Sequence, residues 1–143
     1  MANIIPFAFR GELFSGTHNF ANGGDSFKIA LYTSIAAFGT GSTVYITTNE
    51  VSSGGGSGYT TGGQVLGSQA VASGTAVASV DFADSSIASA TFSAAGAAIY
   101  NDDKSDKLCV VLDFGGSKTA TNGTFTIAFP DPSTPANAII SMS

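Results

Sequence analysis

The chain offers few groups for nucleophilic or acid–base catalysis. His18 is the only histidine and Cys109 the only cysteine among its 143 residues. A nucleophile needs a base within hydrogen-bonding distance, and no acid or nucleophile has a motif-level link to His18, so we predict a hydrogen-bonded structural histidine. Cys109 lies in the apolar run 108–111 and is predicted to be a buried, inert thiol without an intramolecular disulfide. We therefore expect no catalytic residues, no cofactor and no enzyme activity.

An acidic segment, Asn101–Asp106, is the one candidate for a metal site. It contains three aspartates, whose oxygens suit a hard cation such as calcium. It lacks the regular spacing and the bidentate glutamate of a calcium loop, and lysines lie within and beside it. A solvated hairpin turn is therefore predicted, with no bound metal. Asp81, Asp84 and Asp113 are expected at strand ends, where carboxylates accept bonds from turn N–H groups.

Two glycine-containing motifs are predicted to be turns and not functional sites. Gly115–Thr119 resembles a phosphate loop, but it lacks the glycine four residues before a Gly-Lys pair, so we predict a turn. Asn122–Thr124 matches a glycosylation sequon but is interpreted as a turn, because no secretory signal precedes it. No small-molecule substrate is expected.

Composition narrows the class of partner. Charged residues make up 10% of the chain and the net charge is −5, whereas an ordinary soluble domain is about 25% charged. Five basic residues cannot neutralise a run of phosphates, so nucleic acid is not expected as a partner. No apolar run approaches the length of a membrane span. A small, neutral surface loses little side-chain entropy when it is ordered against another protein, which favours assembly.

Alternating apolar residues indicate strands. Phe27–Thr33 alternates strictly and is predicted to be a half-buried β-strand, around which the domain is organised. Lys107–Phe114 is apolar on both faces, which is typical of a central strand. Asn122-Gly123 predicts a hairpin turn. Shorter strands are expected at Val44–Thr48, Thr75–Phe82, Ser89–Phe92, Ala97–Tyr100 and Ala138–Met142. A break is expected at Ala94–Gly96 and a flexible loop at Ser52–Gly58. Prolines 130, 132 and 135 are expected to prevent regular strand pairing.

These elements predict one mainly-β domain over residues 1–143. About eight to ten short strands with glycine-rich turns indicate an antiparallel β-sandwich or a jelly-roll-like barrel. Phe7–Phe14 is expected to form a helix of one or two turns. Residues 1–7 are predicted to form an N-terminal arm, because Pro6 favours an extended Ile5. The arm covers either its own domain or a neighbouring subunit, and in the second case Ile4, Ile5, Pro6 and Phe7 form an interface.

The order of several sequence blocks resembles a family of small structural proteins of tailed bacteriophages. The blocks are Gly11–Phe20, Asp25–Ser34, Thr47–Val51, Gly58–Gly63, Thr91–Asn101, Val111–Gly116 and Asn122–Ile127. Two features depart from the family pattern: small residues replace an aromatic residue around Ile87–Ser89, and the segment Ser52–Ser57 lengthens the loop before Tyr59. The resemblance implies a virion component.

Within that class we expect a capsid decoration, or cement, protein that is made in the host cytoplasm and resides on the capsid surface. Its expected partners are the major capsid protein and further copies of itself, as a homotrimer, because icosahedral lattices present three-fold positions. A tail or baseplate component is the first alternative, with Val44–Thr48 as an edge strand between subunits. A carbohydrate-binding module is the second, with exposed Tyr32, Tyr45, Tyr59 and Tyr100 stacking on sugars. The absence of tryptophan argues against this module, and core or interface positions are favoured for the tyrosines.

Overall fold

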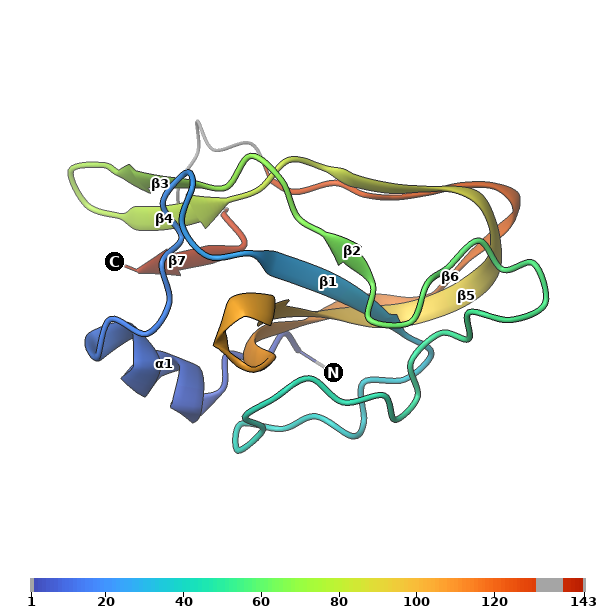
Figure 1. Ribbon diagram of the computed structural model, residues 1–143, viewed down its shortest axis with the longest axis horizontal. Coiled ribbons are helices and arrows are strands. Elements are labelled where there is room, and N and C mark those ends of the chain that lie inside the picture. The colour runs from blue at the N-terminus through green and yellow to red at the C-terminus, as the bar shows by residue number, and fades with distance from the viewer. Residues whose placement is uncertain (1, 131–137, 143) are drawn as a thin grey trace.

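The computed structural model describes residues 2–130 and 138–142, and their strands form two antiparallel sheets (Figure 1). The first sheet has the order β2-β1-β5-β6 and the second β3-β4-β7. The strands are β1 (Phe27–Tyr32), β2 (Gln64–Val65), β3 (Ala70–Ser73), β4 (Ala78–Asp81), β5 (Ser85–Asn101), β6 (Lys107–Ile127) and β7 (Ile140–Met142). An α-helix, α1 (Phe7–Phe14), precedes them, and a 3-10 helix, η1 (Asp102–Lys104), lies between β5 and β6.

The mainly-β class is confirmed, and the two antiparallel sheets are consistent with a β-sandwich. The expected number of strands was wrong, because the described residues form seven, two of them long, and these close no barrel. Among the same residues, no helix is both long enough and apolar enough to span a bilayer.

One bent hairpin, β5–β6, connects the two layers of the molecule. The strands pair from Asn101↔Lys107 to Ser85↔Ile127. The half next to η1 lies beside β1 in the first sheet, and the ribbon then curls over so that its other half faces that sheet (Figure 1). The two short strands expected at 89–92 and 97–100 are therefore parts of one strand of 17 residues.

Bulges replace the breaks that the sequence predicted in this hairpin. Between the pairs Ala94↔Lys118 and Gly96↔Asp113, Ala95 alone stands opposite residues 114–117 of β6. The predicted hairpin at Asn122-Gly123 and the turn at 115–119 are wrong, because β6 continues through both. Asn122 has a φ of 48°, and its N–H donates to Thr91 Oγ1 at 2.9 Å. A residue with a left-handed backbone conformation occurs in bulges as well as in turns, and a bulge bends a strand without ending it.

Two hydrophobic clusters lie on opposite faces of the first sheet. The larger one fills the space between the layers and includes Phe9, Phe27 and Phe82. The smaller one includes Tyr32, Phe38 and Val111 and is covered by the segment after β1. The strand at 27–32 is thus confirmed, but it is buried on both faces and not on one.

The segment that covers the smaller cluster is irregular. Only Val44 forms a β-bridge, with Lys107, so the predicted strand Val44–Thr48 is wrong. Tyr45 and Ile46 are instead partly buried and pack against the cluster. Ser52–Gly58 has neither helix nor strand, as predicted, although Ser57 is buried and donates to the Ser52 carbonyl at 2.8 Å.

The start of β6 is apolar and buried on both faces, as predicted for residues 107–114. Its expected central position is wrong, since β6 is the last strand of its sheet. The two hydrophobic clusters cover its faces there, and isolated bridges from Ile4 and Val44 shield its outer edge. Cys109 is free and buried, as predicted, and burial raises the pKa of its thiol.

The remaining expectations lie near the chain ends and in the second sheet. The helix Phe7–Phe14 is confirmed. Only Ala78–Asp81 of the predicted strand 75–82 and Ile140–Met142 of the predicted strand 138–142 are regular. Pro132 and Pro135 lie outside the described residues.

Candidate functional site

His18 is the centre of a buried polar network, as predicted for a structural histidine. Its side chain is 0% exposed, and its Nε2 lies 2.8 Å from Glu12 Oε2. Its Nδ1 lies 3.0 Å from the Asn101 side-chain nitrogen. That amide is oriented by two further bonds, because Asn101 Nδ2 donates to Asp25 Oδ2 at 2.8 Å and Oδ1 accepts from the Asp103 N–H at 3.2 Å.

The orientation of Asn101 fixes the tautomer of His18. Because the Asn101 nitrogen is the donor, His18 Nδ1 must accept, so the ring proton is on Nε2 and is donated to Glu12. Both ring nitrogens therefore have protein partners, and neither is available to take a proton from a substrate. The network ties α1 and the following turn to the β5–β6 end.

Lysines balance the two carboxylates of this network. Lys107 Nζ donates to Glu12 Oε1 at 2.6 Å, and Lys104 Nζ lies 3.5 Å from Asp25 Oδ1. Burial raises the pKa of Glu12, but the hydrogen bonds from Lys107 and His18 and the charge of Lys107 outweigh it, so the pKa falls below its ordinary value. The pKa of Asp25 is also lowered, because bonds from Asn19 and Asn101 and the Lys104 charge outweigh burial.

The acidic segment 101–106 is the turn between β5 and β6, as predicted. Asp102 accepts from Lys28 Nζ at 2.9 Å, and Asp103 Oδ2 accepts from the Ser26 N–H at 2.7 Å. Within residues 2–130 and 138–142, no three His, Cys, Asp or Glu side chains are grouped so as to hold a metal ion. Of the other acids, Asp84 and Asp113 accept backbone N–H bonds from Phe129 and Gly115.

Two of the four tyrosines, Tyr45 and Tyr59, donate to one carboxylate, Glu50, which the sequence did not indicate as a site. Glu50 accepts from Tyr45 Oη at 2.6 Å, Tyr59 Oη at 2.7 Å and the Gly62 N–H at 2.7 Å. Tyr100 donates to the Gly62 carbonyl at 2.6 Å. These bonds hold the irregular segment 45–62 against the first sheet.

The tyrosines lie largely in the core, as favoured by the sequence, and not on the surface as a carbohydrate-binding module would require. Tyr32, Tyr59 and Tyr100 are buried, and Tyr45 stacks on Tyr100 with ring centroids 4.6 Å apart. Burial is the largest cause that raises the pKa of each of the four hydroxyls. The sugar-stacking alternative therefore loses the side chains on which it depended.

The predicted N-terminal arm lies largely on its own domain. Ile4 and Val111 exchange backbone hydrogen bonds of 2.8 Å in both directions. Ile4 and Ile5 pack on the smaller and larger clusters, and Pro6 is buried. Phe7 is 62% exposed. Of the four residues predicted to form an interface, Phe7 thus presents most surface to a neighbour, and the interface role stays a prediction.

An exposed apolar surface surrounds α1 and β7, which lie side by side (Figure 1). We call it the α1–β7 face, and its most exposed side chains are Phe14 at 92%, Met142 at 58% and Val71 at 53%. A groove of about 390 Å³ between α1 and β7 borders Phe14 and Met142. A second, smaller groove continues from Leu13 and Met142 to Val71. Among the described residues that line the two grooves, Arg10 is the one that carries a charge, and its guanidinium carbon lies 5.3 Å from the Phe7 ring centre.

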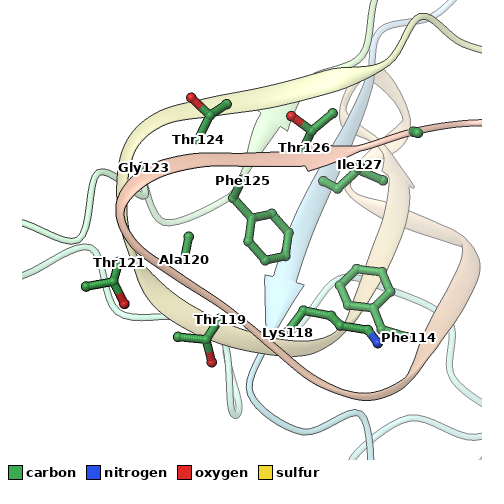
Figure 2. Close-up of a pocket in the computed structure, with 11 residues that line it drawn as sticks. Phe114, Lys118, Thr119, Ala120, Thr121, Gly123, Thr124, Phe125, Thr126 and Ile127 are labelled. Atoms are coloured by element: carbon green, nitrogen blue, oxygen red, sulfur yellow. The ribbon is translucent and has the colours of Figure 1, made fainter.

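A second concave surface lies inside the curl of β6. Figure 2 shows Phe125, Ile127, Ala120 and Phe114 on the inner side of the curved strand, with Lys118 among them, and four threonines on the outer side. The space has a volume of about 690 Å³. We call it the β6 groove. The groove could not be foreseen from the sequence, because residues 115–119 and 122–123 were predicted to be turns, whereas they belong to β6.

Comparison of the chain with protein-family models, with curated proteins and with solved structures found no match.

Proposed function

We propose that this chain is a structural protein of a bacteriophage virion, of the capsid-decoration or cement type. In this proposal the protein binds the outer capsid, stabilises contacts between capsomers and associates with itself as a homotrimer. The α1–β7 face is the observation that carries the proposal. The low charge of the chain and the order of its sequence blocks support it further.

Large exposed apolar side chains that are contiguous mark contact surfaces, because a monomer in water leaves few of them uncovered. Phe14, at 92% exposed, buries almost no area within its own chain. Covering one phenylalanine at an interface contributes about 1.5–3 kcal/mol. We assign the α1–β7 face to the contact between copies, and Phe7 extends it at the start of the helix.

The described part of the structure does not contain the edge strand on which the tail or baseplate alternative was based. That alternative required Val44–Thr48 as an edge strand between subunits, and these residues form no strand. The capsid surface is therefore the location that we propose.

Sedimentation velocity of the purified protein tests the role of the face. We expect a trimer, and Phe14→Ser should weaken its assembly about tenfold or more, because about 1.4 kcal/mol corresponds to tenfold. Val65→Ser is the matched control, since Val65 is 63% exposed on β2, outside both grooves of the face. It should leave assembly unchanged.

Binding to particles that lack this chain completes the test. The wild type and Val65→Ser should bind such particles, and Phe14→Ser should bind them more weakly. Equal assembly and equal capsid binding by all three proteins would remove the support that the α1–β7 face gives to the proposal.

A further inference from the structure

The far half of β6 is an uncovered strand edge. β6 is the last strand in its sheet, and its outer side is bridged only at Lys107 and Val111 within the described residues. Beyond Asp113, the described part of the chain places no second strand along it. A strand edge of this kind presents unpaired N–H and C=O groups that another extended chain can pair with.

Cross-strand contacts show which residues direct their backbone outward. The hydroxyls of Ser86 and Thr126 lie 3.1 Å apart, and those of Ser93 and Thr119 lie 2.6 Å apart. Side chains approach this closely in non-hydrogen-bonded antiparallel pairs, in which the backbone groups of both residues point away from the partner strand. Thr119 and Thr126 therefore direct their N–H and C=O groups toward the open edge.

The β6 groove lies directly inside this edge. Phe125 and Ile127 form its largely buried floor, and Phe114 and Ala120 are partly exposed. An extended chain paired with β6 would direct alternate side chains over this floor, because successive residues of a strand face opposite sides. The groove therefore favours apolar side chains at every second position of its occupant.

Lys118 supplies the charge that selects the occupant. It is the one charged residue among the described residues that line the groove. No described acidic side chain forms an ion pair with it, whereas Lys28, Lys104 and Lys107 each have one. In a chain of net charge −5, this position favours a carboxylate from a partner. A second β6 could not supply it, because residues 114–127 contain no Asp or Glu.

We propose that the far edge of β6 binds an extended segment of a partner protein, which carries alternating apolar side chains and an acidic residue opposite Lys118. The occupant adds a strand to β6 by backbone hydrogen bonds and covers the β6 groove. This inference goes beyond the proposed function and does not depend on it, since it concerns a different surface from the α1–β7 face.

Fluorescence anisotropy with a labelled peptide tests the site. The probe is Val-Thr-Val-Thr-Asp-Thr-Val, blocked at both ends, in which the three Val and the Asp share one face of the strand. The comparison peptides replace its Asp by Lys or carry N-methyl groups on alternate residues. We expect saturable binding of the probe, at least tenfold weaker binding of the Lys peptide, and no binding of the N-methylated peptide. Equal binding of all three, or no binding of the probe, would overturn the proposal.

Protein variants locate the binding. Lys118→Glu should weaken binding of the probe about tenfold, whereas Val65→Glu, on the opposite edge strand β2, should not. Thr126→Pro removes an outward N–H and should reduce binding strongly, and circular dichroism should confirm that the variant folds. If the variant fails to fold, the N-methylated peptide still tests whether the probe binds through backbone hydrogen bonds. If β6 variants dissociate an oligomer and leave the probe unbound, the occupant is a second copy and the proposal is wrong.

Discussion

Gly63 lies where the segment before β2 crosses β1, and the close approach leaves no room for a side chain. Its φ is +79°. A Cβ at this position would overlap the carbonyl oxygen of Ile29 and lie 2.7 Å from the Ala30 Cα. Both neighbours belong to the backbone of β1, so no side-chain rotation can relieve the overlap. We expect Gly63→Ala to be severely destabilising.

The magnitude follows from three contributions. A left-handed backbone costs a non-glycine residue about 1–2 kcal/mol. Relieving the overlap requires β2 to move away from β1, which weakens the pairs Lys28↔Val65 and Ile29↔Gln64 at about 0.5–1.5 kcal/mol for each hydrogen bond. Displacement of the buried Leu66 beyond it adds about 1–2 kcal/mol. With one hydrogen bond lost for each pair, the total loss in free energy of unfolding is therefore about 3–7 kcal/mol.

Two glycines provide matched controls for urea denaturation. Gly62 has a φ of +92°, but a Cβ there would meet only Tyr100 Oη at 3.5 Å. Gly55 has a φ of +68° and open space around it. Gly62→Ala and Gly55→Ala should each cost only the backbone contribution of about 1–2 kcal/mol. If Gly63→Ala lies within about 1 kcal/mol of Gly62→Ala, the reasoning from close approach is refuted.

Further predictions concern the core and the dependence of stability on pH. Leu112→Ala should cost about 2–5 kcal/mol in urea denaturation, since Leu112 packs in the larger cluster; a near-neutral result would contradict that placement. The lowered pKa values of Glu12 and Asp25 stabilise the fold above their ordinary values of 4.5 and 3.8, and this stability is lost as the pH falls through the lowered values. Melting temperatures between neutral and acidic pH should show this, and Glu12→Gln should show a shallower fall. The raised tyrosine pKa values stabilise the fold below 10.0, and this contribution is lost as the pH rises from there. Tyrosinate absorbance should therefore appear together with unfolding; its appearance in the folded protein would contradict the burial of the four hydroxyls.

Local patterns were sufficient where an element is defined by its own residues. The alternation of Phe27–Thr33 predicted β1, and the apolar spacing of Phe7–Phe14 predicted α1. The exposure of Phe14 did not follow from that spacing. Four apolar side chains in an eight-residue helix cannot all face one core, and Phe9 is the one that is buried. To predict the α1–β7 face, one would also have needed to know that β7 and Val71 lie beside α1.

Glycine was ambiguous where distant segments approach each other. Gly96 was interpreted as a break between strands. In the structure a Cβ at this position would lie 2.5 Å from both the Ile35 Cγ2 and the Leu112 carbonyl oxygen. Gly96 therefore lets the covering segment and β6 approach β5, and the strand continues through it. A sequence pattern records that glycine is present but not whether a turn or a neighbour requires it.

Glu50 shows why the polar sites escaped prediction. Its partners Tyr45, Tyr59 and Gly62 lie 5, 9 and 12 residues away in an irregular segment. No helical or strand period relates these positions, so nothing in the sequence brings them together. The same holds for His18 and Asn101, which are 83 residues apart. The hydrogen-bonded character of His18 could be predicted, but its partners could not.

The copy number of this chain relative to the major capsid protein, measured by quantitative mass spectrometry of purified particles, tests the proposed function most directly. A capsid decoration protein that occupies the lattice should be present at a ratio near one. A ratio far below one would contradict this location and indicate the tail or a vertex. Absence of the chain from particles would contradict the proposal that it is a virion protein.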